Sequence, residues 1–301
     1  MGKSRQGLPV DGILLLDKPE GLSSNQALQQ AKRLLNARKA GHTGSLDPVA
    51  TGLLLLCFGE TTKISSLFLG ADKSYRVGIR LGTTTDTGDC TGEVVVEAPV
   101  QVSKSRLAEV LDSYRGQSLQ VPPMYSALKK DGRPLYKLAR KGITVEREPR
   151  PVTVYSLEQE EYSGTLLTLS VRCSRGFYIR TLAEDIGRDL GCGGHVEHLR
   201  RTGIGDFSIN QAVTLEHLES IPTPRDRGTV LLPTDRGLAH LPELSLPESL
   251  ARYLKLGRSV RAAAGLDPGL VRLYVDSGGF LGLGEVTQDQ RVQPKRLFGS
   301  C

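Results

Sequence analysis

Short apolar runs separated by turn residues form the main pattern of this chain. Ile13–Asp17 and Leu53–Phe58 are almost wholly apolar, which predicts two buried strands. Lys73–Leu81 and Thr165–Cys173 alternate polar and apolar residues, which predicts two further strands with one buried face each. A turn rich in Thr, Gly and Asp leads from the third of these strands into another strand-like piece at Glu93–Val96.

Helical periodicity occurs in three segments. Asn25–Leu35 has apolar residues on one face and basic residues on the other, and Ser24 is its predicted N-cap. Arg106–Leu111 predicts a short helix. A third helix follows Thr165–Cys173, closes with Gly191 as its predicted C-cap, and has the following apolar face: Ile179, Leu182, Ala183, Ile186 and Leu190.

Strands and helices alternate irregularly, and several strands lie close enough to form hairpins. This order favours an α+β fold with a mixed, largely antiparallel sheet flanked by helices and loops. Ile221–Pro247 contains five prolines and predicts a connector. Beyond it, a short helix at Glu248–Leu256 and two strand-like pieces predict a small β-rich domain. We therefore expect one domain over residues 1–246 and a second over residues 247–301.

Composition narrows the class of protein. Of the 301 residues, 39% are hydrophobic and only 5% aromatic, with no Trp, so the core should be aliphatic. The absence of a CxxC pair argues against a disulfide framework and a zinc ribbon, and fits a reducing compartment. No secretion-type apolar segment or stretch near the ~18 residues of a membrane span is present, so we expect a soluble, cytoplasmic protein. The five cysteines are odd in number: Cys57, Cys90, Cys173, Cys192 and Cys301.

The stretch GHTGSLDPVATGLLLLCFGETTK, from Gly41 to Lys63, places Asp47 in a Gly-rich loop directly before a buried strand. An Asp-Pro step in such a loop can be a simple turn whose carboxylate binds backbone N–H groups. It can also present a nucleophile or a general base from a rigid strand. A carboxylate used in this way needs a cation that keeps it ionised when substrate closes the pocket. Arg180, at a strand-to-helix corner, is a candidate for that cation.

Other kinds of site have less support. The chain has no P-loop motif, no GxGxxG in its glycine-rich C-terminal part and no GxSxG. Cys192, His195 and His198 are typical zinc ligands, but no fourth ligand follows at a suitable spacing. A metal-dependent hydrolase built on these three residues is an alternative that a metal assay would test.

Most of the net charge of +6 comes from one segment. Residues 125–150 contain eight basic and three acidic residues, interleaved with Tyr125 and Tyr136, and show little apolar periodicity. Such a segment can be a solvated surface, or a flexible arm that closes over a phosphate backbone. Weaker support for a nucleic-acid partner comes from two basic pairs: Arg38-Lys39 and Arg200-Arg201.

Five ordered motifs are long enough to identify a family. They are LLLDKPEGLSSNQALQ, the Asp47 stretch quoted above, DKSYRVGIRLGTTTDTGD, PPMYSALKKDGRPLYKLARKG and SRGFYIRTLAEDIG. With these motifs the chain, from about Gly12 onward, resembles the TruB family of tRNA pseudouridine synthases. The resemblance implies a pseudouridine-synthase fold that isomerises uridine 55 in the T loop of tRNA after flipping the base out. It implies no cofactor and no metal, and it makes the C-terminal part a PUA-type RNA-binding domain.

The resemblance also implies roles for single residues. Asp47 would be the catalytic aspartate, which either attacks the ribose or removes its C2′ proton, and Arg180 would be its partner cation. Tyr75 would stack on the uracil and help to remove the C5 proton. The other implied substrate contacts are Tyr178 and Leu199 in the pocket, His42 in the opened T loop, and Lys18 and Lys63, which support the site or meet RNA.

Residues 125–150 correspond to the flexible thumb of this family. The implied partner is the T stem-loop of tRNA, and we expect the protein to act as a monomer. Phe177 stands where many relatives carry threonine, which should leave the chemistry intact. The alternative is a non-catalytic RNA-binding or tRNA-folding protein on the same scaffold, in which substituting Asp47 changes nothing measurable. The implied contacts to the RNA backbone are Lys129, Lys130, Arg133, Lys137 and Arg140.

Overall fold

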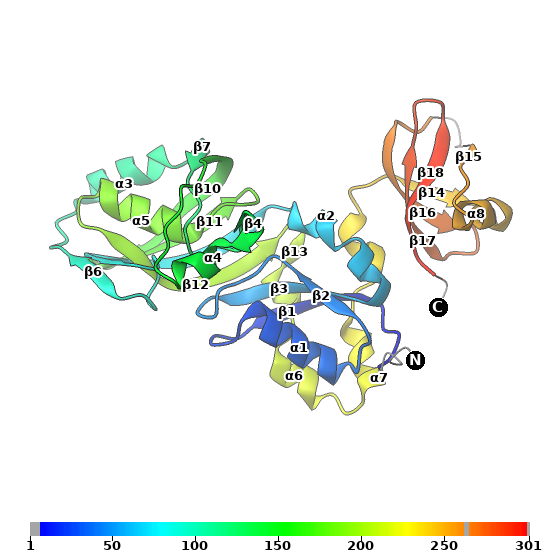
Figure 1. The fold of residues 1–301 in the computed structure, drawn as a ribbon, viewed down its shortest axis with the longest axis horizontal. Helices are drawn as coiled ribbons and strands as arrows, with labels where there is room; N and C mark the ends of the chain where they lie inside the picture. Colours follow the sequence, from blue (N-terminus) through cyan, green and yellow to red (C-terminus); the bar gives the residue numbers. More distant parts are fainter. Residues whose placement is uncertain (1–6, 262–264, 300–301) are drawn as a thin grey trace.

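The computed structural model describes residues 7–261 and 265–299 and is built on a nine-stranded sheet (Figure 1). Seven strands follow the order β1-β3-β12-β4-β11-β10-β7, while β2 pairs with β3 and β13 with β12. The neighbouring pairs are antiparallel except β3 with β12. The predicted α+β class with a mixed, largely antiparallel sheet is therefore confirmed. The strands are β1 (Gly12–Lys18), β2 (Ala40–Thr43), β3 (Thr51–Phe58), β4 (Lys73–Leu81), β7 (Gly116–Gln120), β10 (Arg150–Tyr162), β11 (Leu166–Cys173), β12 (Gly194–Ile204) and β13 (Phe207–Ser208).

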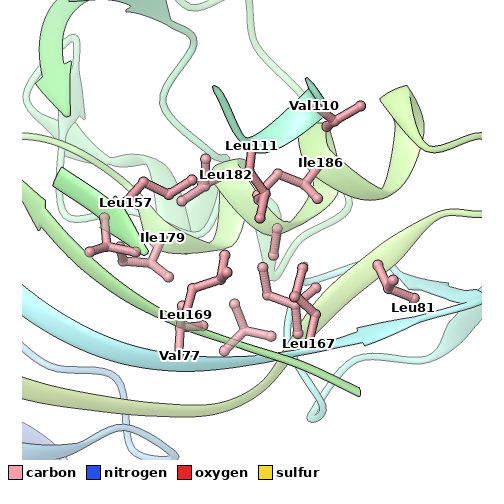
Figure 2. Close-up of a cluster of buried hydrophobic side chains, with 14 of the residues drawn as sticks. Val77, Leu81, Val110, Leu111, Leu157, Leu167, Leu169, Ile179, Leu182 and Ile186 are labelled. Carbon is pink, nitrogen blue, oxygen red and sulfur yellow. The ribbon is translucent and has the colours of Figure 1, made fainter. Parts of the chain in front are cut away.

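Two helices cover one face of this sheet. The helices α3 (Lys104–Ser113) and α5 (Ile179–Asp189) lie over β4, β10 and β11 (Figure 1). Figure 2 shows the aliphatic core between these helices and the sheet, in which Leu182 of α5 faces Leu169 of β11. Burial of this apolar face fixes α5 on the sheet, so the polar residues of its first turn have a defined position.

The strands β1 and β3 are buried on both faces. Alternate residues pack against α1 (Ser24–Leu34) and α6 (Leu215–Ser220) on one side, and against α2 (Ser65–Leu69) on the other. A strand covered on both faces has no solvent side that would require polar residues. This explains why both strands were nearly continuous apolar runs in the sequence.

A second, five-stranded sheet forms the C-terminal part and stands apart from the first in Figure 1. It has its own buried core, and its Phe280 and Leu283 also join a cluster with Phe68 and Phe207 of the larger part. The division of roles into a catalytic domain over 1–246 and an RNA-binding domain over 247–301 stays a prediction. The elements of the C-terminal part are β14 (Glu243–Leu246), α8 (Glu248–Lys255), β15 (Val260–Arg261), β16 (Gly269–Val275), β17 (Phe280–Val286) and β18 (Arg291–Leu297).

Two helix caps differ from the prediction by one residue. The N-cap of α1 is Ser23, whose hydroxyl accepts from Gln26 N–H while the Gln26 side chain accepts from Ser23 N–H. Ser24 is instead the first helical residue, which frees its hydroxyl for a tertiary contact. The C-cap of α5 is Leu190, and Gly191 follows it with a φ of 79°, a left-handed conformation that glycine adopts without strain.

The predicted arm and connector contain more regular structure than the sequence indicated. The strands β7, β10 and β12 were also not predicted. In the described residues no helix is long and apolar enough to span a membrane. Cys301 and residues 1–6 lie outside the described residues, and the expectation of no secretion-type segment rested partly on residues 1–6. The short elements are β5 (Thr83–Thr85) with β6 (Val94–Glu97), β8 (Lys129–Lys130) with β9 (Arg133–Pro134) and α4 (Leu135–Ala139) in the arm, and α7 (Pro224–Arg227) in the connector.

Candidate active site

Asp47 lies in the loop between β2 and β3, and hydrogen bonds tie this loop to its surroundings. The Asp47 carbonyl accepts from Ala50 N–H at 3.1 Å. The Ser24 hydroxyl accepts from Leu46 N–H at 2.7 Å and donates to the Leu46 carbonyl at 3.0 Å. Ser24 is 3% exposed, so water does not compete for these bonds. The first residue of α1 therefore fixes the residue immediately before Asp47.

Arg201 of β12 holds the same loop from the sheet. Its guanidinium donates to the Leu53 carbonyl at 2.7 Å and, at longer range, to the carbonyls of Gly44 (3.2 Å) and Ser45 (3.5 Å). Arg201 is 1% exposed, so it is a buried cation whose hydrogen-bond partners are mainly backbone oxygens. Gly52 of β3 allows the Arg201 backbone to lie this close to β3. Its φ is 98°, and a Cβ there would lie 2.3 Å from the Arg201 carbonyl oxygen.

Arg180, in the first turn of α5, reaches Asp47. Its Nη2 lies 3.1 Å from Asp47 Oδ2. The same guanidinium donates to the carbonyls of Tyr125 (2.6 Å) and Thr87 (3.2 Å), and its Nε lies 3.9 Å from Asp89 Oδ2. The Arg180 side chain is 8% exposed and that of Asp47 is 45% exposed. The cation is therefore fixed inside the protein, while the Asp47 side chain is only partly buried.

Opposing effects determine the charge of Asp47. Burial raises the pKa of its carboxyl, Arg180 lowers it, Asp89 raises it and Lys18 lowers it, in that order of size. Burial also lowers the pKa of Lys18 to about 8, although Asp47 favours its charged form. The Lys18 ammonium donates to three backbone carbonyls, one of them of Pro48 (3.3 Å), the residue after Asp47. The two cations thus offset part of the cost of keeping this carboxylate ionised.

Tyr75, Leu199 and Tyr178 come from three different parts of the fold: β4, β12 and the start of α5. Tyr75 of β4 lies opposite Arg201 in the register of β4 and β12, and its hydroxyl interacts with the Arg201 guanidinium. Tyr75 and Leu199 both pack against the core beneath α5. Tyr178 is the N-cap residue of α5. Burial raises the pKa of both tyrosine hydroxyls, and the charge of Asp47 adds to this effect, so both lie within its electrostatic range.

His42 lies on β2, the strand that leads directly into the Asp47 loop. Its backbone pairs with Leu56 of β3. Burial lowers the pKa of its imidazole, and the Arg201 cation lowers it further. Its Nδ1 is buried and has no hydrogen-bond partner among the described residues. Burial and the Arg201 cation therefore both favour the neutral imidazole, whose Nδ1 is closed off from solvent.

Lys63 lies at the junction between the two sheets. Its ammonium forms an ion pair with Glu60 and donates to the Leu297 carbonyl at 3.0 Å. It also lies 5.9 Å from the centre of the Phe298 ring. These contacts connect it to the C-terminal sheet rather than to the Asp47 carboxylate. A direct contact of Lys63 with substrate stays a prediction.

The arm carries its basic side chains on the surface. The Lys130 ammonium donates to the Glu146 carbonyl at 2.9 Å, and the Arg140 guanidinium lies 5.5 Å from the centre of the Tyr136 ring. The root of the arm reaches the site because the Tyr125 carbonyl accepts from Arg180. The five predicted RNA-backbone contacts are all exposed: Lys129, Lys130, Arg133, Lys137 and Arg140.

One expectation from the sequence is wrong, and one alternative receives no geometric support. Arg200 and Arg201 are not a basic surface pair, because Arg201 is buried and Arg200 binds both oxygens of Asp17 at 2.6 and 3.0 Å. Within residues 7–261 and 265–299, no group of three His, Cys, Asp or Glu side chains could hold a metal ion. The candidates for such a group were Cys192, His195 and His198.

Several residues that shape the site were not predicted. Asp89 is 5% exposed and its Oδ1 accepts from the hydroxyls of Thr87 (2.9 Å) and Thr91 (2.5 Å). Its position in a Thr/Gly/Asp-rich segment indicated only a turn. The side chains of the other residues act on backbone atoms far away in the sequence, and no local pattern reveals such contacts. These residues are Ser24, Gln120 and Arg201.

Comparison with family models gives three adjoining matches. Residues 32–179 match the TruB family pseudouridylate synthase N-terminal domain. Residues 180–239 match the tRNA pseudouridylate synthase B C-terminal domain, and residues 242–298 match the C-terminal model of pseudouridine synthase II TruB.

Comparison with curated proteins and solved structures agrees with these matches. The chain is 53% identical over 294 residues to the tRNA pseudouridine synthase B of Pseudomonas aeruginosa (strain UCBPP-PA14), covering 97% of both chains. It is 54% identical over 291 residues to that of Azoarcus sp. (strain BH72), covering 97% of this chain and 96% of the relative. A structure of an H/ACA RNP bound to a substrate RNA containing 2′-deoxyuridine has the same fold, with a TM-score of 0.72, 22% identity and coverage of 100% and 92%. A Cbf5-Nop10-Gar1 complex gives a TM-score of 0.71 at 25% identity, covering 96% of this chain and 84% of that one.

Proposed function

Because the chain belongs to the TruB family of pseudouridylate synthases and is an isomerase, we propose that it converts uridine 55 in the T loop of tRNA to pseudouridine. The curated relatives are tRNA pseudouridine synthases B that align over nearly their whole length, which supports tRNA as the substrate. The exposed basic arm supports a polyanionic partner.

The observation that supports this function most strongly is the contact between Asp47 and Arg180 at 3.1 Å. In the isomerisation the bond between uracil N1 and ribose C1′ breaks, and C5 then bonds to C1′. The C5 proton is lost and N1 gains a proton, so substrate and product contain the same atoms. Asp47 begins the reaction either as a nucleophile on the ribose or as the base that removes the C2′ proton. Both roles require the ionised carboxylate, which Arg180 stabilises.

The pocket residues have distinct roles in this proposal. Tyr75 stacks on the uracil and helps to remove the C5 proton; burial raises the pKa of its hydroxyl, while the Arg201 guanidinium beside it favours the phenolate that can accept this proton. Leu199 provides an apolar wall beside the base, and Tyr178 lines the pocket from the start of α5. Lys18 supports the loop through the Pro48 carbonyl without reaching the uracil.

The RNA contacts extend outward from the pocket. His42 enters the T loop that the flipped base has left, and its partly exposed position on β2, the strand that leads into the Asp47 loop, supports this role. The arm lies over the RNA backbone with its basic side chains. The C-terminal sheet is a PUA-type RNA-binding domain in this proposal, and Lys63 lies where RNA crossing both sheets would pass. We further expect a monomer that acts in the cytoplasm without a cofactor or metal.

Mapping of pseudouridine in a tRNA transcript tests this function. After incubation with the purified protein, we expect pseudouridine at position 55 alone. A matched transcript with cytidine at position 55 should remain unmodified. Product at another uridine would overturn the proposed position. A protein that binds the T stem-loop but forms no pseudouridine would instead be the non-catalytic RNA-folding protein considered above.

A further inference from the structure

Gln120, the last residue of β7, is bonded to the backbone of Tyr178 through both atoms of its amide. Tyr178 N–H donates to Gln120 Oε1 at 2.8 Å, and Gln120 Nε2 donates to the Tyr178 carbonyl at 3.1 Å. The Gln120 amide thus pairs with the backbone N–H and C=O of Tyr178, as a neighbouring strand would. Gln120 is 7% exposed, so water does not replace these bonds. Tyr178 is the N-cap residue of α5, and no side chain caps this helix. Gln120 therefore adds a polar anchor at the helix start to the apolar packing that holds the rest of α5 on the sheet.

A second link joins the same two segments. The Tyr125 carbonyl, five residues after Gln120, accepts from Arg180 at 2.6 Å. The residues between them include Pro122 and Pro123, which fix their own φ angles and favour extended backbone before them. A stiff segment at the root of the arm is thus bonded at both ends to the first turn of α5. Arg180, which belongs to that turn, is the residue that reaches Asp47.

We propose, resting on the function proposed above, that Gln120 is a positioning residue for the isomerisation. It fixes the first turn of α5 so that Arg180 meets Asp47, and it connects the root of the RNA-binding arm to this ion pair. Gln120 does not touch the reacting atoms in this proposal. Its effect on the reaction passes through Tyr178 and Arg180.

The variant Gln120→Met separates this role from a general structural one. Met keeps the length and shape of the side chain but bonds neither backbone atom of Tyr178, and a small displacement of a catalytic group is costly. We expect the single-turnover rate of pseudouridine formation to fall about tenfold to hundredfold. The dissociation constant for tRNA should change less than about threefold, because the exposed basic residues of the arm are intact. Gln117→Met is the matched control, since Gln117 lies on the same strand, is exposed, and should give the wild-type rate.

The pH dependence of the rate gives a readout that loss of stability alone would not move. In Gln120→Met, weaker contact with Arg180 lets the pKa of Asp47 rise, so the acid side of the profile shifts to higher pH. The groups that act on Asp47 are Arg180 from α5, Asp89 from the turn after β5, and Lys18 from β1, and only the first is displaced. A protein that is merely less stable would give a smaller reaction amplitude at the wild-type midpoint.

A wild-type rate and pH profile in a folded Gln120→Met would overturn the inference, as would an equal loss in Gln117→Met. If Gln120→Met does not fold, Gln120→Asn tests the same point, because its amide is one methylene shorter and cannot span both atoms of Tyr178. The wild-type enzyme is the control for the proposed function. If it forms no pseudouridine 55, that function fails, whereas the inference fails only when the wild type is active.

Discussion

Arg200 and Arg201 are adjacent on β12, but their surroundings differ. Arg201→Met should lower the free energy of unfolding by about 2–4 kcal/mol, because the carbonyls of Leu53 and Gly44 lose a charged donor that water cannot replace. Arg200→Met is the matched control, since its side chain is 41% exposed and its ion pair with Asp17 is worth about 0–1 kcal/mol. Urea unfolding measures both values. Equal losses in the two variants would contradict the role of Arg201 in holding the Asp47 loop.

Single site residues could be predicted from the sequence where the neighbouring residues indicate their role. Asp47 stood out because a carboxylate preceded a buried strand, and Arg180 because it opened a helix. Gln120 and Ser24 could not be found in this way. Their partners are backbone atoms 58 and 22 residues away, and nothing in the side chain type indicates which backbone it will bond.

Among the elements, the basic arm has the clearest expected effect on binding. Lys137 is exposed on α4, and each phosphate contact that is lost should reduce the slope of log affinity against log salt by about 0.7–0.9. We therefore expect Lys137→Gln to weaken tRNA binding at low salt and to flatten its salt dependence by that amount. Dissociation constants measured over a salt series give the slope. The control is Lys104→Gln, an exposed lysine of α3 outside the arm, and an unchanged slope in Lys137→Gln would remove Lys137 from the interface.

Elements with a regular pattern were predictable, and elements shaped by their neighbours were not. The buried strands β1 and β3 and the amphipathic helix α5 were found because burial alone dictates their patterns. The strand β12 lies in the middle of the sheet but was missed. Its pairing with β4 shifts register between Val196 and His198 and again between Arg201 and Gly203, and each shift interrupts the alternation that marks a strand.

In the whole molecule, specific contacts connect the C-terminal sheet to the larger part. The Tyr274 hydroxyl donates to Asp235 at 2.5 Å, and Arg272 donates to the Leu241 carbonyl at 3.0 Å. Phe280 and Leu283 of the C-terminal sheet also share a hydrophobic cluster with Phe68 and Phe207 of the larger part. The sequence indicated a small β-rich part but not these contacts, because they join residues from separate elements. They give the second sheet a defined position beside the first.

The proposed function of the whole molecule rests on the ion pair between Asp47 and Arg180. The most direct test compares Asp47→Asn with Asp206→Asn, the same change in an exposed turn between β12 and β13, in single-turnover pseudouridine formation and in tRNA binding. We predict that Asp47→Asn lowers the rate by more than about a thousandfold, changes the dissociation constant less than about threefold, and that Asp206→Asn changes neither. Pseudouridine formed by Asp47→Asn at the wild-type rate would contradict the proposed role of Asp47.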